Sequence, residues 1–70
     1  MFFTRIRVYD LNNSGLLDAV LRELPDMCET FTCYPKEGLI IVQSSQGAIQ
    51  IEDGLRARSI NMEHMICKMI

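Results

Sequence analysis

The 70-residue sequence has little glycine and proline and no long apolar run. Four glycines and two prolines, beside 49% hydrophobic and 23% charged residues, exclude a disordered or collagen-like chain and indicate a compact one. The apolar start of MFFTRIRVYD is interrupted at once by Thr4 and Arg5, so it predicts neither a signal peptide nor a membrane-spanning segment. A chain of this length has room for one small core, and we expect a single domain over residues 1–70.

The sequence also lacks an excess of either charge and an even set of cysteines. Seven basic and nine acidic side chains give a net charge of −2, which disfavours binding to nucleic acid by counterion release. An odd number of cysteines argues against a secreted protein held by disulfides. We therefore expect a cytoplasmic protein with free thiols at its three cysteines, Cys28, Cys33 and Cys67.

Residue types that carry catalysis are scarce. His64 is the only histidine, the acidic residues are scattered, and no glycine-rich phosphate loop occurs. General acid–base and nucleophilic catalysis need partner groups held close together. The sequence therefore predicts no enzyme and no cofactor.

The first half of the chain shows one strand and one helix. Residues 2–9 alternate as in a strand, with Ile6 and Val8 on the inner face. A turn over residues 12–15 leads into a helix that Pro25 closes. The apolar residues of that helix recur at helical spacing: Leu17, Val20, Leu21 and Leu24.

Residues 27–34 are rich in threonine and aromatics and predict a second strand. Residues 35–38 read as a hairpin turn and residues 39–43 as the third strand. Residues 44–70 then allow two arrangements.

In the first arrangement a helix begins at Ser44 or Ser45, and residues 62–70 form the last strand. The apolar residues of this helix are Ala48, Ile51, Leu55 and Ile60. The result is a ferredoxin-like βαββαβ sandwich of the α+β class, an antiparallel sheet with two helices on one face. Covering one sheet face with two crossover helices favours this arrangement, which is the one we predict.

In the second arrangement residues 44–47 form a turn, residues 48–52 a fourth strand, and a helix begins near Leu55, giving βαβββα. The alternation in Ile49-Gln50-Ile51 supports a strand. Gly54 also supports it, because glycine inside a helix costs about 1 kcal/mol.

The outer face of the predicted sheet is the candidate site. Alternation leaves aromatic and cationic side chains outside on the first strand, and the third strand is apolar on both faces. Soluble proteins seldom carry an apolar patch with a charged rim unless a partner covers it. A loop or the C-terminal segment covering the patch is the other interpretation. We predict a protein interface formed by Phe3, Arg5, Arg7, Tyr9, Leu39 and Ile41.

The predicted function is therefore non-catalytic protein binding, either as a homodimer or as an inhibitor or adaptor of a larger protein. A two-fold axis closes a self-complementary patch, which makes a homodimer the simplest form. We expect no membrane partner.

The order of elements, the chain length and the end of the first helix at Leu21–Pro25 resemble the heavy-metal-associated domains of copper chaperones. Those domains bind a soft metal through a Cys-x-x-Cys pair after the first strand. Here Asn13 and Leu16 stand at the two cysteine positions and Leu11 at the methionine before them. The resemblance thus implies the fold without the metal site.

A soft-metal carrier is the first alternative function, because the segment Met62–Met69 is rich in sulfur donors. On a strand, however, Cys67 and its neighbours Met65 and Met69 face away from His64, so the donors do not converge. We therefore expect no metal site there.

Single-stranded RNA binding is the second alternative. Ile6–Leu11 resembles the shorter ribonucleoprotein motif of RNA-recognition domains, and Lys36–Gln43 occupies the place of the longer one. Arg7, Leu39 and Ile41 stand where that family has aromatic residues that stack on bases. This departure, together with the net charge, argues against RNA as the partner.

Overall fold

The computed structural model describes residues 1–9 and 14–70. Within them the elements follow the order of the first arrangement. The strands and helices are β1 (Phe2–Val8), α1 (Ser14–Glu23), β2 (Thr30–Tyr34), β3 (Leu39–Ser44), α2 (Ala48–Ala57) and β4 (Met65–Met69). Two 3₁₀ turns, η1 (Leu24–Asp26) and η2 (Pro35–Glu37), follow α1 and β2. The βαββαβ order is confirmed, and the alternative βαβββα order is wrong.

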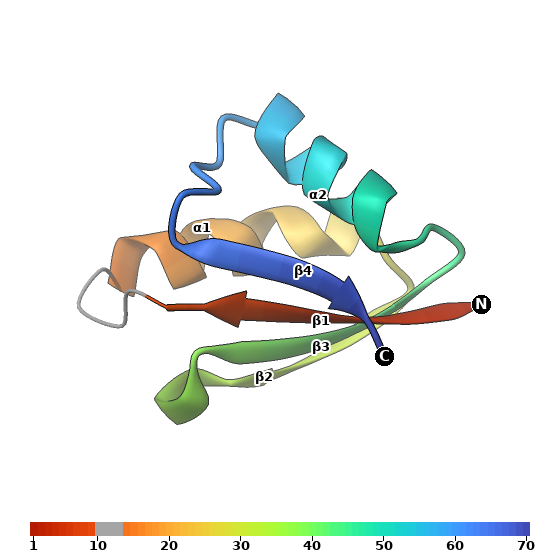
Figure 1. Ribbon diagram of the computed structural model, residues 1–70, viewed down its shortest axis with the longest axis horizontal. Helices are drawn as coiled ribbons and strands as arrows, with labels where there is room; N and C mark the ends of the chain where they lie inside the picture. The colour runs from red at the N-terminus through yellow and green to blue at the C-terminus, as the bar shows by residue number, and fades with distance from the viewer. Residues whose placement is uncertain (10–13) are drawn as a thin grey trace.

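The strands form one antiparallel sheet in the order β2-β3-β1-β4. Both helices lie on the same side of this sheet, and the other side carries no helix (Figure 1). This is the ferredoxin-like α+β sandwich that the sequence predicts. No helix in the described part of the chain is long and apolar enough to cross a membrane.

The alternation of the strands decides which side chains enter the core. In β1 the inner positions Thr4, Ile6 and Val8 are buried and the outer ones are exposed. In β3 the inner residues Ile40 and Val42 are fully buried, whereas the outer ones are half-buried. The predicted faces of both strands are therefore confirmed.

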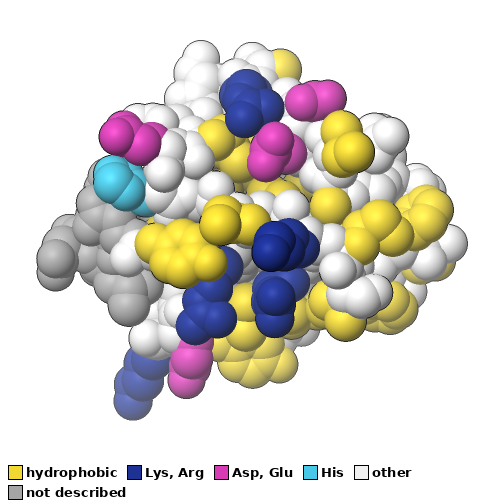
Figure 2. All heavy atoms as spheres, in the orientation of Figure 1, with side chains coloured by type: hydrophobic (Ala, Val, Ile, Leu, Met, Phe, Trp, Pro, Cys, Tyr) yellow, Lys and Arg dark blue, Asp and Glu magenta, His cyan; other side chains and the backbone are white. Residues whose placement is uncertain are grey.

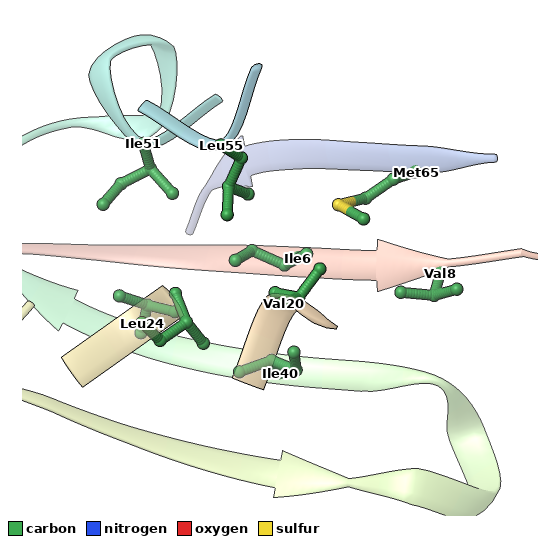
Figure 3. Packing of buried hydrophobic residues seen from close by; sticks show 9 residues of the cluster. Ile6, Val8, Val20, Leu24, Ile40, Ile51, Leu55 and Met65 are labelled. Atoms are coloured by element: carbon green, nitrogen blue, oxygen red, sulfur yellow. The ribbon is translucent and has the colours of Figure 1, made fainter. Parts of the chain in front are cut away.

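The core lies between the sheet and the two helices. Figure 3 shows Ile51 and Leu55 pointing from α2 toward the sheet, with Ile6 of β1 beneath them. The fully or almost fully buried cluster comprises Ile6, Val8, Val20, Leu24, Ile40, Val42, Ile51, Leu55 and Met65.

Helix α2 begins at Ala48, later than the predicted Ser44 or Ser45. The reason is that Ser44 completes β3 and is buried there. Its Oγ donates to the carbonyl oxygen of Met27 at 3.2 Å and accepts from the backbone N–H of Gln46 at 3.0 Å. Ser44 thus ties the end of β3 to the segment before β2.

Strand β2 begins at Thr30, later than the predicted start at residue 27. The backbone N–H groups of Met27 and Cys28 instead donate to the carbonyl oxygen of Leu24, at 2.9 and 3.1 Å. These bonds continue the turn that follows α1, so the chain enters the sheet three residues later.

The predicted hairpin between β2 and β3 is present. Gly38 adopts the left-handed conformation, with φ of 61°, which favours glycine. Its N–H donates to the carbonyl oxygen of Pro35 at 3.2 Å, and its own carbonyl accepts from Val8 N–H at 2.7 Å. The turn thereby holds the start of β3 against the end of β1.

Candidate functional site

The side of the sheet opposite the helices, called the open face below, collects outward side chains from all its strands. Strand β1 contributes Phe3, Arg5 and Arg7, strand β2 contributes Thr30, Thr32 and Tyr34, strand β3 contributes Leu39, Ile41 and Gln43, and strand β4 contributes Ile66 and Lys68. The register fixes their neighbours. Arg5 lies between Ile41 and Lys68, and Arg7 lies between Leu39 and Ile66.

All six predicted interface residues lie on or beside this face. Phe3 and Tyr9 are 49% and 59% exposed, and Leu39 and Ile41 are half-buried between the neighbouring strands. The structure thus brings together the set that alternation in the first and third strands indicates.

Sequence reasoning missed six further residues of the face, and three of them add apolar surface or charge. Tyr34 from β2 is 45% exposed and Ile66 from β4 is 40% exposed, and Lys68 stands directly opposite Arg5. Alternation in β4 indicates which face its residues occupy, but only the register reveals that Lys68 adjoins the cations of β1. The signal that pointed to residues 65–69 was instead their sulfur content.

The cations of the open face have no carboxylate partner among the described residues. The ion pairs of those residues lie elsewhere and involve Arg56 and Arg58. Within residues 1–9 and 14–70, Arg5, Arg7 and Lys68 therefore form an unpaired positive cluster, on a protein whose net charge is −2. Figure 2 shows Lys and Arg side chains gathered over β4 and β1, bordered by apolar side chains.

A hollow of about 70 Å³ lies within this cluster. It is lined by Arg5, Arg7, Tyr9, Ile66 and Lys68. A hollow measured in this way needs roughly 10–15 Å³ to hold one water molecule, so this one has room for a small polar group. Its lining offers guanidinium and ammonium donors and one phenol, which is the chemistry that holds an oxyanion.

A larger cleft of about 540 Å³ opens between the segment before β2 and helix α2. Its lining includes the carboxylates Asp26, Glu29 and Asp53 together with Arg58 and the thiol of Cys28. Among the described residues no group of three or more His, Cys, Asp and Glu side chains has a metal-binding arrangement. The cleft is also remote from the predicted interface, on the helix side of the sheet.

The three cysteines are free and their thiols are held protonated. Burial raises the pKa of Cys67 to about 11, nearby Glu52 adds to the rise, and Arg56 opposes it. Burial also raises the pKa of Cys33 and of Cys28, where Glu29 contributes as well. Since a metal ligand must be a thiolate, these shifts work against soft-metal binding.

The metal-loop positions of the resemblance are only partly described. Leu11 and Asn13 lie outside the described residues, and Leu16 lies in α1, half-buried against the core. Comparisons with protein-family models, curated proteins and solved structures returned no match. The relation to heavy-metal-associated domains and the soft-metal carrier function therefore stay predictions.

Proposed function

We propose that this protein is a small non-catalytic module that binds another protein through its open face. The observation that supports this most is the exposure of Phe3, Tyr9 and Ile66 around half-buried Leu39 and Ile41. Covering such apolar surface gains about 25 cal/mol for each Å² removed from water. The three free thiols support a reducing, cytoplasmic setting for the module.

The charge of the face favours a different protein over a second copy of this chain. A two-fold axis passing through the cation cluster would set Arg5, Arg7 and Lys68 against the same cations of the other copy. Like charges brought together in this way cost several kcal/mol at an interface. We therefore propose an acidic partner, to which the protein binds as an inhibitor or adaptor, and a homodimer becomes one outcome of the test.

Single-stranded RNA is the second candidate, and the position of Tyr34 favours it. Together with Phe3 and Tyr9 it gives the open face exposed aromatic rings beside three cations. Bases stack on such rings and phosphates pair with such cations. We rank RNA second because the two central positions, Leu39 and Ile41, are aliphatic and stack poorly.

The test compares cross-linking from the two sides of the molecule. A photoreactive phenylalanine analogue replaces Ile66 on the open face or Ile49 on α2, which is 74% exposed and serves as the matched control. Both variants are expressed in the cells that make the protein and are irradiated there. We expect a specific cross-linked protein from position 66 and none from position 49.

The cross-linked protein is then purified and its affinity measured. We expect Ile41→Asp to weaken binding at least tenfold, because it places a carboxylate in the apolar centre, and Ile49→Asp to leave it unchanged. Equal cross-links from both positions, or an affinity that Ile41→Asp does not alter, would contradict the proposal. A cross-link from position 66 to a second copy would keep the face and replace the acidic partner by a homodimer.

A further inference from the structure

The pairing of β1 with β4 contains an unfavourable contact. Arg5 stands directly opposite Lys68 in the register of the two strands. Opposite charges at such cross-strand positions stabilise a sheet, and like charges destabilise it. A contact that breaks such a stability rule, with no other contact to offset its cost, is typical of a functional site.

A second cation strengthens the conflict. Arg7 follows Arg5 at the next outward position of β1, and residues two apart on a strand lie about 7 Å from each other. Neighbouring strands are about 4.8 Å apart, so Lys68 is no farther from Arg5 than Arg7 is. None of these cations has an ion pair within residues 1–9 and 14–70.

The hollow sits where these charges converge. Its lining adds Tyr9, whose hydroxyl can donate a hydrogen bond, and Ile66, whose side chain forms an apolar wall. Partial exclusion of water strengthens the attraction between a cation and an anion. At about 70 Å³ the hollow has room for a carboxylate or a phosphate group.

We propose that this hollow receives one carboxylate group of an aspartate or glutamate side chain on the partner protein. The inference rests on the proposed function and names the recognition element within it. Guanidinium groups bind carboxylates through paired hydrogen bonds, and Lys68 adds a third charge-assisted donor. The aliphatic side chains of Leu39 and Ile41 beside the cations fit an apolar protein surface better than stacked bases.

The test is an amide-shift titration of the ¹⁵N-labelled protein at low salt with a capped hexaglutamate peptide. We expect saturable shifts of the amides of Tyr9, Arg5, Arg7 and Lys68, and no response to the uncharged hexaglutamine peptide. The variant Lys68→Gln should weaken hexaglutamate binding about tenfold, the effect of one charged hydrogen bond. Arg22→Gln removes an exposed cation from α1 and should leave the affinity unchanged.

Two further arms of the titration identify other sources of the anion. Inorganic phosphate and an eight-nucleotide oligouridine are titrated under the same conditions. The carboxylate assignment is overturned if either binds the same amides more tightly than hexaglutamate does. It is also overturned if hexaglutamate shifts are spread over the helices, or if Lys68→Gln binds as the wild type does.

The proposal for the hollow can fail without the failure of the proposed function, and the two results can be told apart. If cross-links from position 66 persist and Lys68→Gln binds the captured protein with unchanged affinity, the hollow is not the recognition site although the open face still binds. If position 66 captures no partner, the proposed function fails whatever the response to hexaglutamate. Dispersed amide spectra of each variant verify that it is folded.

Discussion

The arginines at the end of α2 and the cations of the open face have opposite surroundings. On α2, Arg56 lies 3.2 Å from Glu52 and 3.7 Å from Asp53, and Arg58, which directly follows α2, lies 3.4 Å from Glu23 of α1. On the open face one of the two register neighbours of Arg5 is another cation, Lys68. Arg56 and Arg58 thus have carboxylate partners, whereas Arg5, Arg7 and Lys68 of the open face have none among the described residues. The net charge of −2 for the whole chain does not reveal this difference between paired and unpaired cations.

The apolar residues divide in the same way along one strand. Ile40 of β3 is fully buried beneath the helices, and Ile41, the next residue, faces the open side and is half-buried. The two neighbours have the same side chain and opposite roles. The contrast between the two sides of the molecule therefore holds for packing as well as for charge.

The largest effect is expected for that pair. Ile40→Ala should lower the free energy of unfolding by about 3 kcal/mol, because it leaves a cavity in the core, and Ile41→Ala by about 1 kcal/mol or less. Urea denaturation of both variants measures the two values. Equal losses would mean that both faces of β3 are packed within the free protein.

The next effect concerns Cys67, which lies on the helix side of β4 between the outward residues Ile66 and Lys68. With its pKa raised from 9.0 to about 11, its thiolate fraction at pH 8 is roughly a hundredfold smaller. We expect iodoacetamide to modify it about a hundredfold more slowly than it modifies the same cysteine in the unfolded chain. Mass spectrometry of timed samples measures the rate, and comparable rates would contradict the burial of this thiol.

The same shift predicts a dependence of stability on pH. Because the folded state holds Cys67 as a thiol, its contribution is complete below the unfolded pKa of 9.0 and is lost as the pH rises toward about 11. The wild type should therefore lose more stability than Cys67→Ala between pH 9 and pH 11. Parallel losses in the two proteins would show that other groups cause the decline.

A smaller effect is expected at Thr4, an inner residue of β1. Its side chain is fully buried, and its Oγ1 has no hydrogen-bond partner among the described residues. Thr4→Val removes this hydroxyl at nearly constant volume and should raise the free energy of unfolding by about 1 kcal/mol. Chemical denaturation measures the change, and a loss of stability would reveal a partner for the hydroxyl.

The faces of the first and third strands could be predicted because a period of two is a local property of the sequence. Residues 44–70 were ambiguous because Ile49 and Ile51 would share one face of a strand, whereas on a helix residues two apart point to nearly opposite sides. On α2 Ile51 is buried and Ile49 is exposed. Gly54, which favoured the strand, has a packing reason: a Cβ there would lie 2.6 Å from Cε of Met27. Met27 lies far from Gly54 in the sequence, so local periodicity could not indicate this contact.

Only part of the candidate site could be predicted, because only part of it follows from local periodicity. Phe3, Arg5 and Arg7 follow from alternation within one strand, and Leu39 and Ile41 follow from the apolar character of another. Lys68 joins Arg5 only through the pairing of the first and last strands of the chain. Periodicity carries no information on that register, so the like-charge contact had no signal in the sequence.

The free energy of unfolding of Lys68→Glu at low salt tests most directly the difference in charge pairing between the open face and α2. The substitution turns the like-charge pair with Arg5 into an opposite-charge pair, and we expect a gain of about 0.5 kcal/mol. Arg56→Glu, the matched change on α2, should lower stability by a similar amount because Glu52 and Asp53 surround it. Losses in both variants would contradict the claim that the open face holds its cations at a cost.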